Sequence, residues 1–316
     1  MARMRVARLL LTCAGLACGA GREVAITIDD LPRGGDARSA EDRSFEAIRA
    51  MTVQLLTPFR EQKIPVTGFV NESKLSPGEM RKILDIWLDA GADLGNHTFS
   101  HANINQVSLA EYEDAVVKGE TVTRAALEAR GKKLGFFRHP YLFTGPTPEI
   151  KKELAAFLAA RGYRIAPVTF DTDDYEFAAA YTNRSEPGLA EPVNRAERVK
   201  QAYLPYMESV VEAFERRSVK VVGREFPQIL LIHANQLNAD TMPQLLAMFR
   251  RRGYSFVTLD HALQDEAYQL PDEYVGRGGW SWIHRWANSN GVGLPSRQEA
   301  EPDPPDWIMK AAKIGN

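Results

Sequence analysis

Five groups of reactive side chains each follow a short apolar run of the kind that forms a buried strand. They are Asp29 with Asp30, His97 with His101, Arg138, the acidic stretch 171–174, and His233. The carboxyl ends of parallel strands lie along one rim of an α/β fold, so these side chains can converge on one site. Strand ends are polar in many proteins, and each group taken alone therefore has an equally good structural explanation.

His97 and His101 are spaced as ligands of a single metal ion. Residues four apart lie on the same face if the segment forms a helical turn. A carboxylate from Asp29 or Asp30 would supply the third ligand. Two histidines and one carboxylate leave positions free for water and substrate, as catalytic zinc sites require. Neighbouring residues of a strand point to opposite sides, so we expect one aspartate to bind the metal and the other to face the bound water.

Apolar runs alternate with amphipathic stretches from residue 24 onwards. Seven short apolar runs predict strands, at residues 24–28, 66–70, 92–95, 134–137, 163–170, 229–232 and 255–259. The stretches between them have helical spacing, which favours parallel strands joined by helical crossovers in an α/β fold. Residues 178–194, rich in Ala, Pro, Gly and polar types, predict an excursion loop.

The two ends of the chain differ from this pattern. Arginines, a short apolar run and small residues make residues 1–20 typical of a secretory signal peptide, with lipid attachment at Cys18 as an alternative. Both cysteines, Cys13 and Cys18, lie inside this segment, so a metal site in the mature protein must use His, Asp and Glu. Residues 269–316 carry four tryptophans among Gly and Pro, and we expect an irregular extension packed on the barrel rather than a sugar-stacking surface.

Composition gives no support for nucleic acid or membrane partners. The 316 residues include 39 Lys and Arg against 41 Asp and Glu, which leaves a formal charge of −2. We therefore expect no nucleic-acid partner and no stable membrane insertion. If residues 1–20 direct export, the protein acts in the periplasm, the cell envelope or the extracellular space. Nothing in the sequence predicts an oligomeric state.

Five ordered stretches resemble the motifs of the polysaccharide deacetylase family (NodB-homology domain, carbohydrate esterase family 4). The stretches are TIDD at 27–30, HTFSH at 97–101, RHPY at 138–141, DTDDY at 171–175 and LLIH at 230–233. The resemblance spans about residues 23–265. It implies a distorted (β/α)7 TIM-like barrel of the NodB-homology type, which we expect to occupy residues 21–268.

The resemblance also implies roles for the residues of the first three motifs. Asp30, His97 and His101 would bind a divalent metal, most simply Zn²⁺, with Co²⁺ or Ni²⁺ as alternatives. Asp29 would be the general base, and Arg138 its ion-pair partner. A bound divalent ion acidifies water, and a nearby guanidinium keeps a carboxylate ionised, so the chemistry suits these roles.

The remaining motifs would supply the acid and the acetyl pocket. By the same resemblance, His233 is the general acid and Asp174 holds and charges it, since a nearby carboxylate raises a histidine pKa. Tyr141 would offer its backbone N–H to the oxyanion. Tyr175 and Leu230 would shape the pocket for the acetyl group.

Three departures from the family pattern bear on the substrate. Leu31–Pro32 follows the aspartates where the family usually has Gly, Tyr175 replaces a usual Trp, and His139 is unusual within its motif. They leave the chemistry intact but alter the shape and polarity of the pocket.

The residues predict a metal-dependent hydrolase, and the resemblance implies that it removes acetyl groups from N-acetylated, and possibly O-acetylated, sugars of a cell-envelope or environmental polysaccharide. The alternative is an amidase of the same barrel that cleaves a small non-sugar C–N bond in an acylamino compound or cyclic ureide. An Fe(II) oxygenase could use the same ligand types, but it leaves Asp29, Arg138 and His233 without roles. A sugar-binding protein without catalysis would not need Asp29 and His233.

Overall fold

The computed structural model describes residues 21–76, 78–183, 192–296 and 299–313. Its strands are β1 (Arg22–Leu31), β2 (Val66–Val70), β3 (Asp93–Asn96), β4 (Phe136–Phe137), β5 (Arg164–Ile165), β6 (Gln228–His233) and β7 (Tyr254–Phe256). Its α-helices are α1 (Phe45–Gln62), α2 (Lys82–Asp89), α3 (Leu109–Lys118), α4 (Thr121–Glu128), α5 (Pro148–Ala160), α6 (Asp174–Thr182), α7 (Pro192–Val222), α8 (Gln236–Arg251), α9 (Leu259–Ala262), α10 (Trp282–Ser289) and α11 (Asp306–Ala311).

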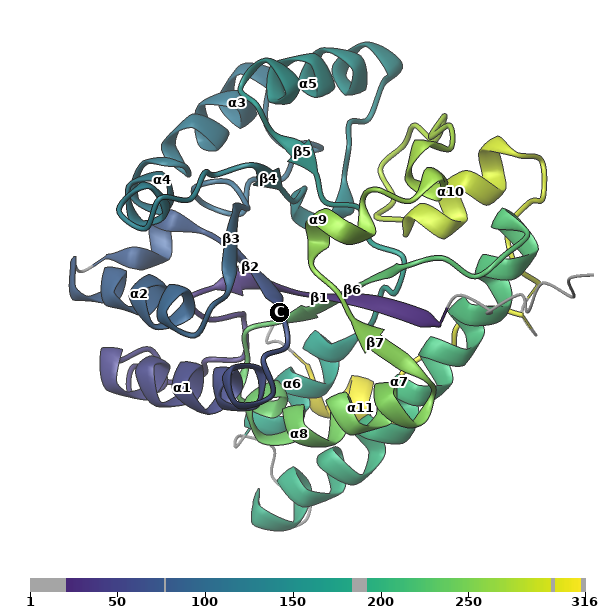
Figure 1. Cartoon of the computed structure of the whole chain (residues 1–316). Coiled ribbons are helices and arrows are strands. Elements are labelled where there is room, and N and C mark those ends of the chain that lie inside the picture. Colours follow the sequence, from purple (N-terminus) through teal and green to yellow (C-terminus); the bar gives the residue numbers. More distant parts are fainter. Residues whose placement is uncertain (1–20, 77, 184–191, 297–298, 314–316) are drawn as a thin grey trace, which may run out of the picture.

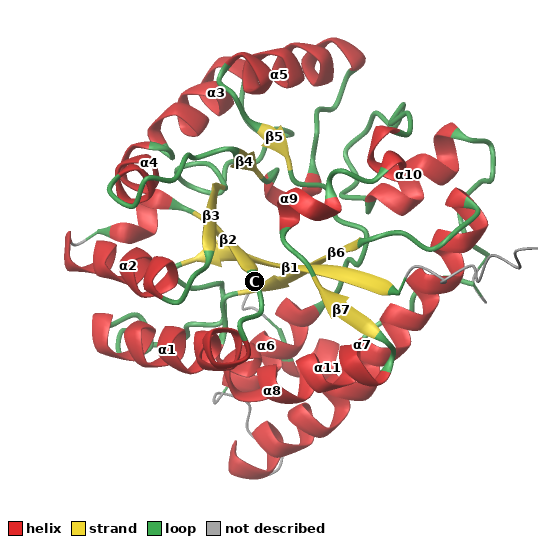
Figure 2. Cartoon of the chain, in the orientation of Figure 1, coloured by secondary structure: helices red, strands yellow, loops and turns green. Residues whose placement is uncertain are grey.

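All strand pairs are parallel, and most helices lie outside the curled sheet, whereas the short helix α9 packs inside it against β1 and β6 (Figures 1 and 2). The strand order is β5-β4-β3-β2-β1-β6, and β7 pairs with β1. Beyond β5, Phe170 forms an isolated parallel bridge with Leu230, which brings the two ends of this order together. The predicted distorted (β/α)7 barrel is confirmed.

Strand β1 lies at the centre of the sheet because it pairs with three neighbours. Residues Val24–Asp29 pair with β6, and Arg22–Val24 pair with β7, so Val24 has partners on both sides of β1. On the side of β7, pairing with β2 begins at Ile26, and the register shifts between Ile28 and Leu31. This irregularity falls at the two aspartates.

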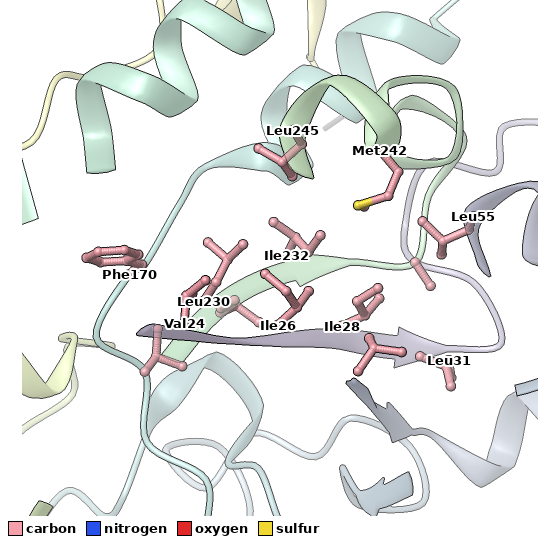
Figure 3. Packing of buried hydrophobic residues seen from close by; sticks show 14 of the residues in the cluster. Val24, Ile26, Ile28, Leu31, Leu55, Phe170, Leu230, Ile232, Met242 and Leu245 are labelled. Atoms are coloured by element: carbon pink, nitrogen blue, oxygen red, sulfur yellow. The ribbon is translucent and has the colours of Figure 1, made fainter. Parts of the chain in front are cut away.

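The core between the sheet and the helices is apolar on both sides. Ile26 and Ile28 of β1 lie beside Leu230 and Ile232 of β6, under side chains of α8 and α1 (Figure 3). All four are at most 2% exposed. β-Branched and Leu side chains suit strands that are buried on both faces.

Several boundaries differ from the prediction; β4 and β5, for example, are only two residues each. Residues 178–182, expected in a loop, form the end of α6, because Ala178, Ala179 and Ala180 are strong helix formers and are buried in the core. The remainder of that predicted loop falls largely on residues 184–191, outside the described part of the chain. Strand β7 ends before Leu259, because Thr258 caps α9 with its hydroxyl.

Two C-terminal helices lie against the barrel helices. Helix α10 contacts α7 and helix α11 contacts α6. Trp282 and Trp286 are buried, and Arg198 covers the ring of Trp307 at 4.2 Å. The predicted signal segment 1–20 lies outside the described residues. Among the described residues, no helix has the length and apolarity needed to cross a bilayer.

Replacement of Ile26 by Ala is expected to lower the free energy of unfolding by roughly 2–5 kcal/mol, because it leaves a cavity in the rigid centre of the sheet. Urea denaturation followed by circular dichroism measures the loss. Val53→Ala is the control, because Val53 is 39% exposed on α1. Equal stability of the two variants would contradict this view of the core.

Candidate active site

The five reactive groups meet at the carboxyl end of the sheet around one cavity of about 670 Å³. Asp29 and His233 are directly paired residues of β1 and β6. His97 follows β3, and Arg138 follows β4. The cavity is lined by Asp29, Asp30, His97, His101, His139, Tyr141, Asp171, Tyr175 and His233, among others. The structure therefore brings together the residues that their positions after strands had predicted.

Asp30, His97 and His101 form a cluster with the composition of a metal site. Their ligand atoms all lie within 4.8 Å of one another. Asp30 Oδ1 lies 3.7 Å from His97 Nε2 and 3.6 Å from His101 Nε2, and this buried oxygen has no hydrogen-bond partner. A buried oxygen without a partner facing two imidazole nitrogens fits a divalent cation such as Zn²⁺.

The other nitrogen of His97 is held by the backbone. His97 Nδ1 lies 2.8 Å from the carbonyl oxygen of Arg138, to which it donates, so Nε2 is left as the acceptor that faces Asp30. Burial lowers the pKa of His97 well below its ordinary value and also lowers the pKa of His101. Both imidazoles are therefore neutral near pH 7, as ligation of a metal requires.

The segment from His97 to His101 is a turn without helical structure, so the expected helical face is wrong. Thr98 and His101 have φ angles of 62° and 57°. The amide of Thr98 donates to the side chain of Asn96 at 2.8 Å, and the side chain of Asn71 donates to the carbonyl of His97 at 2.7 Å. These bonds hold a left-handed turn that brings both imidazoles to Asp30 without a helix.

Both aspartates of β1 line the cavity, although neighbouring residues of a regular strand point to opposite sides. Asp30 has a φ of 70° at the register shift in β1. A bulge of this kind re-aims a side chain, and bulges are frequent beside active sites. Aspartate tolerates the left-handed conformation better than most residues do. The bulge therefore lets Asp29 and Asp30 act at the same cavity with different partners.

Asp29 forms an ion pair with Arg138 and also lies near His97 of the histidine cluster. Arg138 Nη1 lies 3.3 Å from Asp29 Oδ2, and the guanidinium also donates to Thr27 Oγ1 at 2.9 Å and to the carbonyl of Ala166 at 2.8 Å. Burial raises the pKa of Asp29 to about 6, although Arg138 and His233 favour the ionised form. A carboxylate that ionises near pH 6 suits a general base.

His233 forms a close pair with Asp174. His233 Nδ1 lies 2.7 Å from Asp174 Oδ1, and its backbone N–H donates to Oδ2 at 2.9 Å. Burial favours the neutral imidazole, but the charge and hydrogen bond of Asp174 outweigh it and raise the pKa of His233 to about 9. His233 is therefore protonated at neutral pH and can donate a proton.

Two asparagines that sequence reasoning missed complete this pair. Asn235 and Asn238 donate to Asp174 Oδ2 at 3.0 and 2.7 Å. The position of Asn235 just before a predicted helix was a usable signal, because Asn235 caps α8. Fully satisfied in this way, the buried carboxylate keeps its position beside the imidazole.

Tyr141 and Tyr175 flank the cavity as predicted, but Leu230 does not. The Tyr141 ring lies 4.4 Å from that of His101, and the Tyr175 ring lies 5.9 Å from that of His233. Leu230 is fully buried in the core (Figure 3), whereas Leu231 lines the cavity. Side chains alternate along β6, so a shift of one residue changes the face, and the pocket position predicted for Leu230 must be corrected to Leu231.

His139 and Asp171 are buried polar residues at the cavity without a predicted role. Burial, reinforced by Arg285 and Arg138, lowers the pKa of His139 to about 3, so its ring is neutral. Its Nδ1 is buried without a hydrogen-bond partner. Burial and nearby Asp173 raise the pKa of Asp171 to about 7. Both residues add polarity to the wall of the cavity.

Comparison with known proteins agrees with this arrangement. Residues 17–166 match the sequence profile described as polysaccharide deacetylase. A peptidoglycan-N-acetylglucosamine deacetylase of Bacillus cereus is 22% identical over 250 residues, which cover 77% of this chain and 68% of that protein. These matches confirm the resemblance to the polysaccharide deacetylase family that the five motifs indicated.

Solved structures of similar proteins share the fold of this chain. The chitin deacetylase of Colletotrichum lindemuthianum has a TM-score of 0.50 and 22% identity, with 78% of this chain and 88% of that one covered. A pseudoenzyme of the CE4 family from Bacillus anthracis also has a TM-score of 0.50, with 17% identity and coverage of 78% and 66%. Because the same fold occurs in a pseudoenzyme, any inference of catalysis must come from the site residues.

Removal of one member of the histidine cluster is expected to abolish metal binding. Asp30→Ala and His97→Ala should retain less than a tenth of the zinc held by the wild type after reloading, because two ligands do not make a site of useful affinity. Elemental analysis of desalted protein measures this content.

Asp29→Asn should keep the metal, because Asp29 pairs with Arg138. His261→Ala is the control, because His261 is half exposed and pairs with Glu23 away from the cavity. A variant Asp29→Asn that is empty of zinc would reverse our assignment of the two carboxylates.

Proposed function

We propose that this protein is an exported metal-dependent hydrolase that removes acetyl groups from N-acetylated sugars of a polysaccharide. The observation that carries the proposal is the placement of three distinct units on one cavity. These units are the cluster of Asp30, His97 and His101, the buried pair of Asp29 and Arg138, and the charged pair of His233 and Asp174. Amide hydrolysis needs an activated water, a base and an acid, and each unit matches one of these needs.

A divalent cation held by Asp30, His97 and His101 would polarise the acetyl carbonyl and acidify water. Zn²⁺ suits this mixture of nitrogen and oxygen ligands, and Co²⁺ or Ni²⁺ are the alternatives. Neutral imidazoles and an ionised carboxylate are the protonation states that such ligands need. Burial opposes ionisation of Asp30, but Lys74, His101 and His97 outweigh it and lower the pKa of this carboxyl.

Asp29 is the proposed base. It takes one proton from the attacking water as the water oxygen forms its bond to the acetyl carbon. Arg138 holds Asp29 in place from its fully buried position. The backbone N–H of Tyr141 is the proposed donor to the carbonyl oxygen, on which negative charge develops.

His233 is the proposed acid. Its proton goes to the sugar nitrogen as the C–N bond breaks, because an amine leaves readily only after protonation. Since Asp29 and His233 are paired residues of adjacent strands, both reach the same cavity. The immediate products are acetic acid and a free amino sugar, and the acid ionises to acetate by giving its proton to the amine. Transfer of the proton held by Asp29 to His233 restores both residues.

The cavity wall limits the acyl group that is accepted. Leu231 and Tyr175 line the cavity beside the acid, so a longer acyl chain would meet packed side chains. Gly34, Gly35 and Asp36 follow the Leu31–Pro32 turn and also line the cavity. A glycan substrate accords with the resemblance to polysaccharide deacetylases, and its identity is part of the proposal.

Acetate release from acetylated sugars is the direct test. Purified, zinc-loaded protein should release acetate from acetylated chitooligosaccharides, peptidoglycan fragments or acetylated xylan, and Asp29→Asn should lower kcat at least about 100-fold. N-acyl amino acids and allantoin serve as controls. Turnover confined to those two compounds would assign the site to the alternative amidase and contradict the proposed substrate.

A bell-shaped pH profile follows from the protonation states of the proposed base and acid. Activity should rise as Asp29 ionises, around its pKa of about 6, and fall as His233 loses its proton, around its pKa of about 9. The charge of a bound cation lowers both pKa values, so the two limbs should lie at or below these values.

Asp174→Asn should move the alkaline limb to lower pH, because the imidazolium loses its negative neighbour. Asp260→Asn is the control, since Asp260 is exposed on α9. An alkaline limb that stays in place in Asp174→Asn would remove Asp174 from the role of charging His233.

Export is tested separately on the secreted protein. We expect residues 1–20 to be removed, so that the mature chain begins near Gly21 and Arg22, where β1 starts. N-terminal sequencing of protein recovered from outside the cytoplasm measures the start. A mature chain beginning at Met1 would contradict the proposed signal.

A further inference from the structure

A C-terminal segment forms one wall of the cavity. This rim segment, residues 272–285, lies against the Tyr141 loop, residues 139–144. Gly279 of the rim segment lines the cavity, and a Cβ atom at this position would lie only 2.1 Å from the carbonyl oxygen of Tyr141. The two backbones thus approach so closely that only glycine fits.

Arg285 joins the rim segment to the Tyr141 loop from a fully buried position. Its guanidinium donates to the carbonyl of Leu142, to Thr144 Oγ1 at 2.9 Å and to the carbonyl of Trp280 at 2.9 Å. Asp272 Oδ2 lies 3.3 Å from Nη1 and balances the charge. A planar fork of five N–H groups can hold several acceptors at once, which a lysine cannot.

The Tyr141 loop needs such support because its backbone is strained. Tyr141 and Leu142 both have a φ of 56°, in the left-handed region that non-glycine side chains rarely adopt. Arg285 holds the carbonyl of Leu142, which immediately follows the residue whose N–H is the proposed oxyanion donor.

The rim segment is itself fixed to the barrel at two further places. Lys151 of α5 donates to the carbonyls of Asp272 and Tyr274 at 2.6 and 2.8 Å. The backbone N–H of Trp282 donates to the carbonyl of Val168, beyond β5, at 2.7 Å. With both of its ends anchored, the rim segment can transmit the rigidity of the barrel to the Tyr141 loop.

We propose that the rim segment is part of the substrate site and that Arg285 is a positioning residue, which holds the Tyr141 backbone N–H at the developing oxyanion. The inference rests on the proposed function, because this N–H has a catalytic task only in hydrolysis of an acyl group. A segment that only stabilised the fold would affect unfolding without a selective effect on the transition state.

Gly279→Ala tests the wall through catalysis. Its methyl group should displace the Tyr141 carbonyl and lower kcat for an acetylated chitooligosaccharide by about 10- to 100-fold, with KM and zinc content changed less than about threefold. Gly135→Ala is the matched control, because a Cβ there meets no atom within 4 Å. A kcat of Gly279→Ala within twofold of the wild type would overturn the proposal.

Arg285→Lys tests the Tyr141 loop without any assay of activity. Hydrogen exchange measured by mass spectrometry should be at least about tenfold faster in peptides covering residues 139–144, and unchanged in those covering residues 97–101. Unchanged exchange in the Tyr141 loop would overturn the role of Arg285. A wild type that releases no acetate from any glycan would contradict the proposed function, and the exchange result would still decide whether Arg285 holds the loop. If Arg285→Lys fails to fold, the kcat of Gly279→Ala decides.

Discussion

The buried guanidinium of Arg138 is the interaction on which the site depends. A charge removed from water must be matched by partners, and this side chain finds them on β1 and at Ala166, beyond β5. The ring of Phe69 on β2 lies beneath it at 4.8 Å. The backbone carbonyl of Arg138 also orients His97, because it accepts a hydrogen bond from His97 Nδ1. Arg138 therefore holds the proposed base Asp29, the metal-ligand candidate His97 and the strands that carry them.

On the opposite side of the cavity, the buried carboxylate of Asp174 holds its neighbours in place, as the guanidinium of Arg138 does on the first side. The carboxylate of Asp174 is fully buried and accepts from the ring and backbone of His233 and from two asparagines. Asp29, by contrast, keeps one oxygen without a hydrogen-bond partner, as does Asp30. Polar groups are fully satisfied where the site needs rigidity and left unsatisfied where a ligand or a proton can be received.

The alternation of strands and helices and the polar residues at the carboxyl ends of the strands could be predicted from the sequence, because burial requires apolar runs and each run ends at the same rim. Finer geometry could not. The left-handed residues Asp30 and His101 replace the alternation and the helical turn that simple periodicity implies. Leu230 was assigned to the pocket although its neighbour Leu231 faces it, since a short apolar strand carries no signal of which side is the cavity. Contacts of Arg285 with a loop about 140 residues earlier leave no local pattern at all.

Strand β1 pairs both with β2, which follows it closely in the sequence, and with β6, which comes late in the chain. This difference affects the order in which the parts of the site can fold. Asp30, His97 and His101 come from the first 101 residues, and β1, β2 and β3 are consecutive neighbours in the sheet. The pairing of β1 with β6 joins residues about 200 apart, and long-range pairing of this kind is slow to form. As the chain is synthesised from its N-terminus, the histidine cluster can therefore assemble before His233 is added. An ion captured at that stage would favour the early half of the barrel while the remainder of the chain is still unfolded.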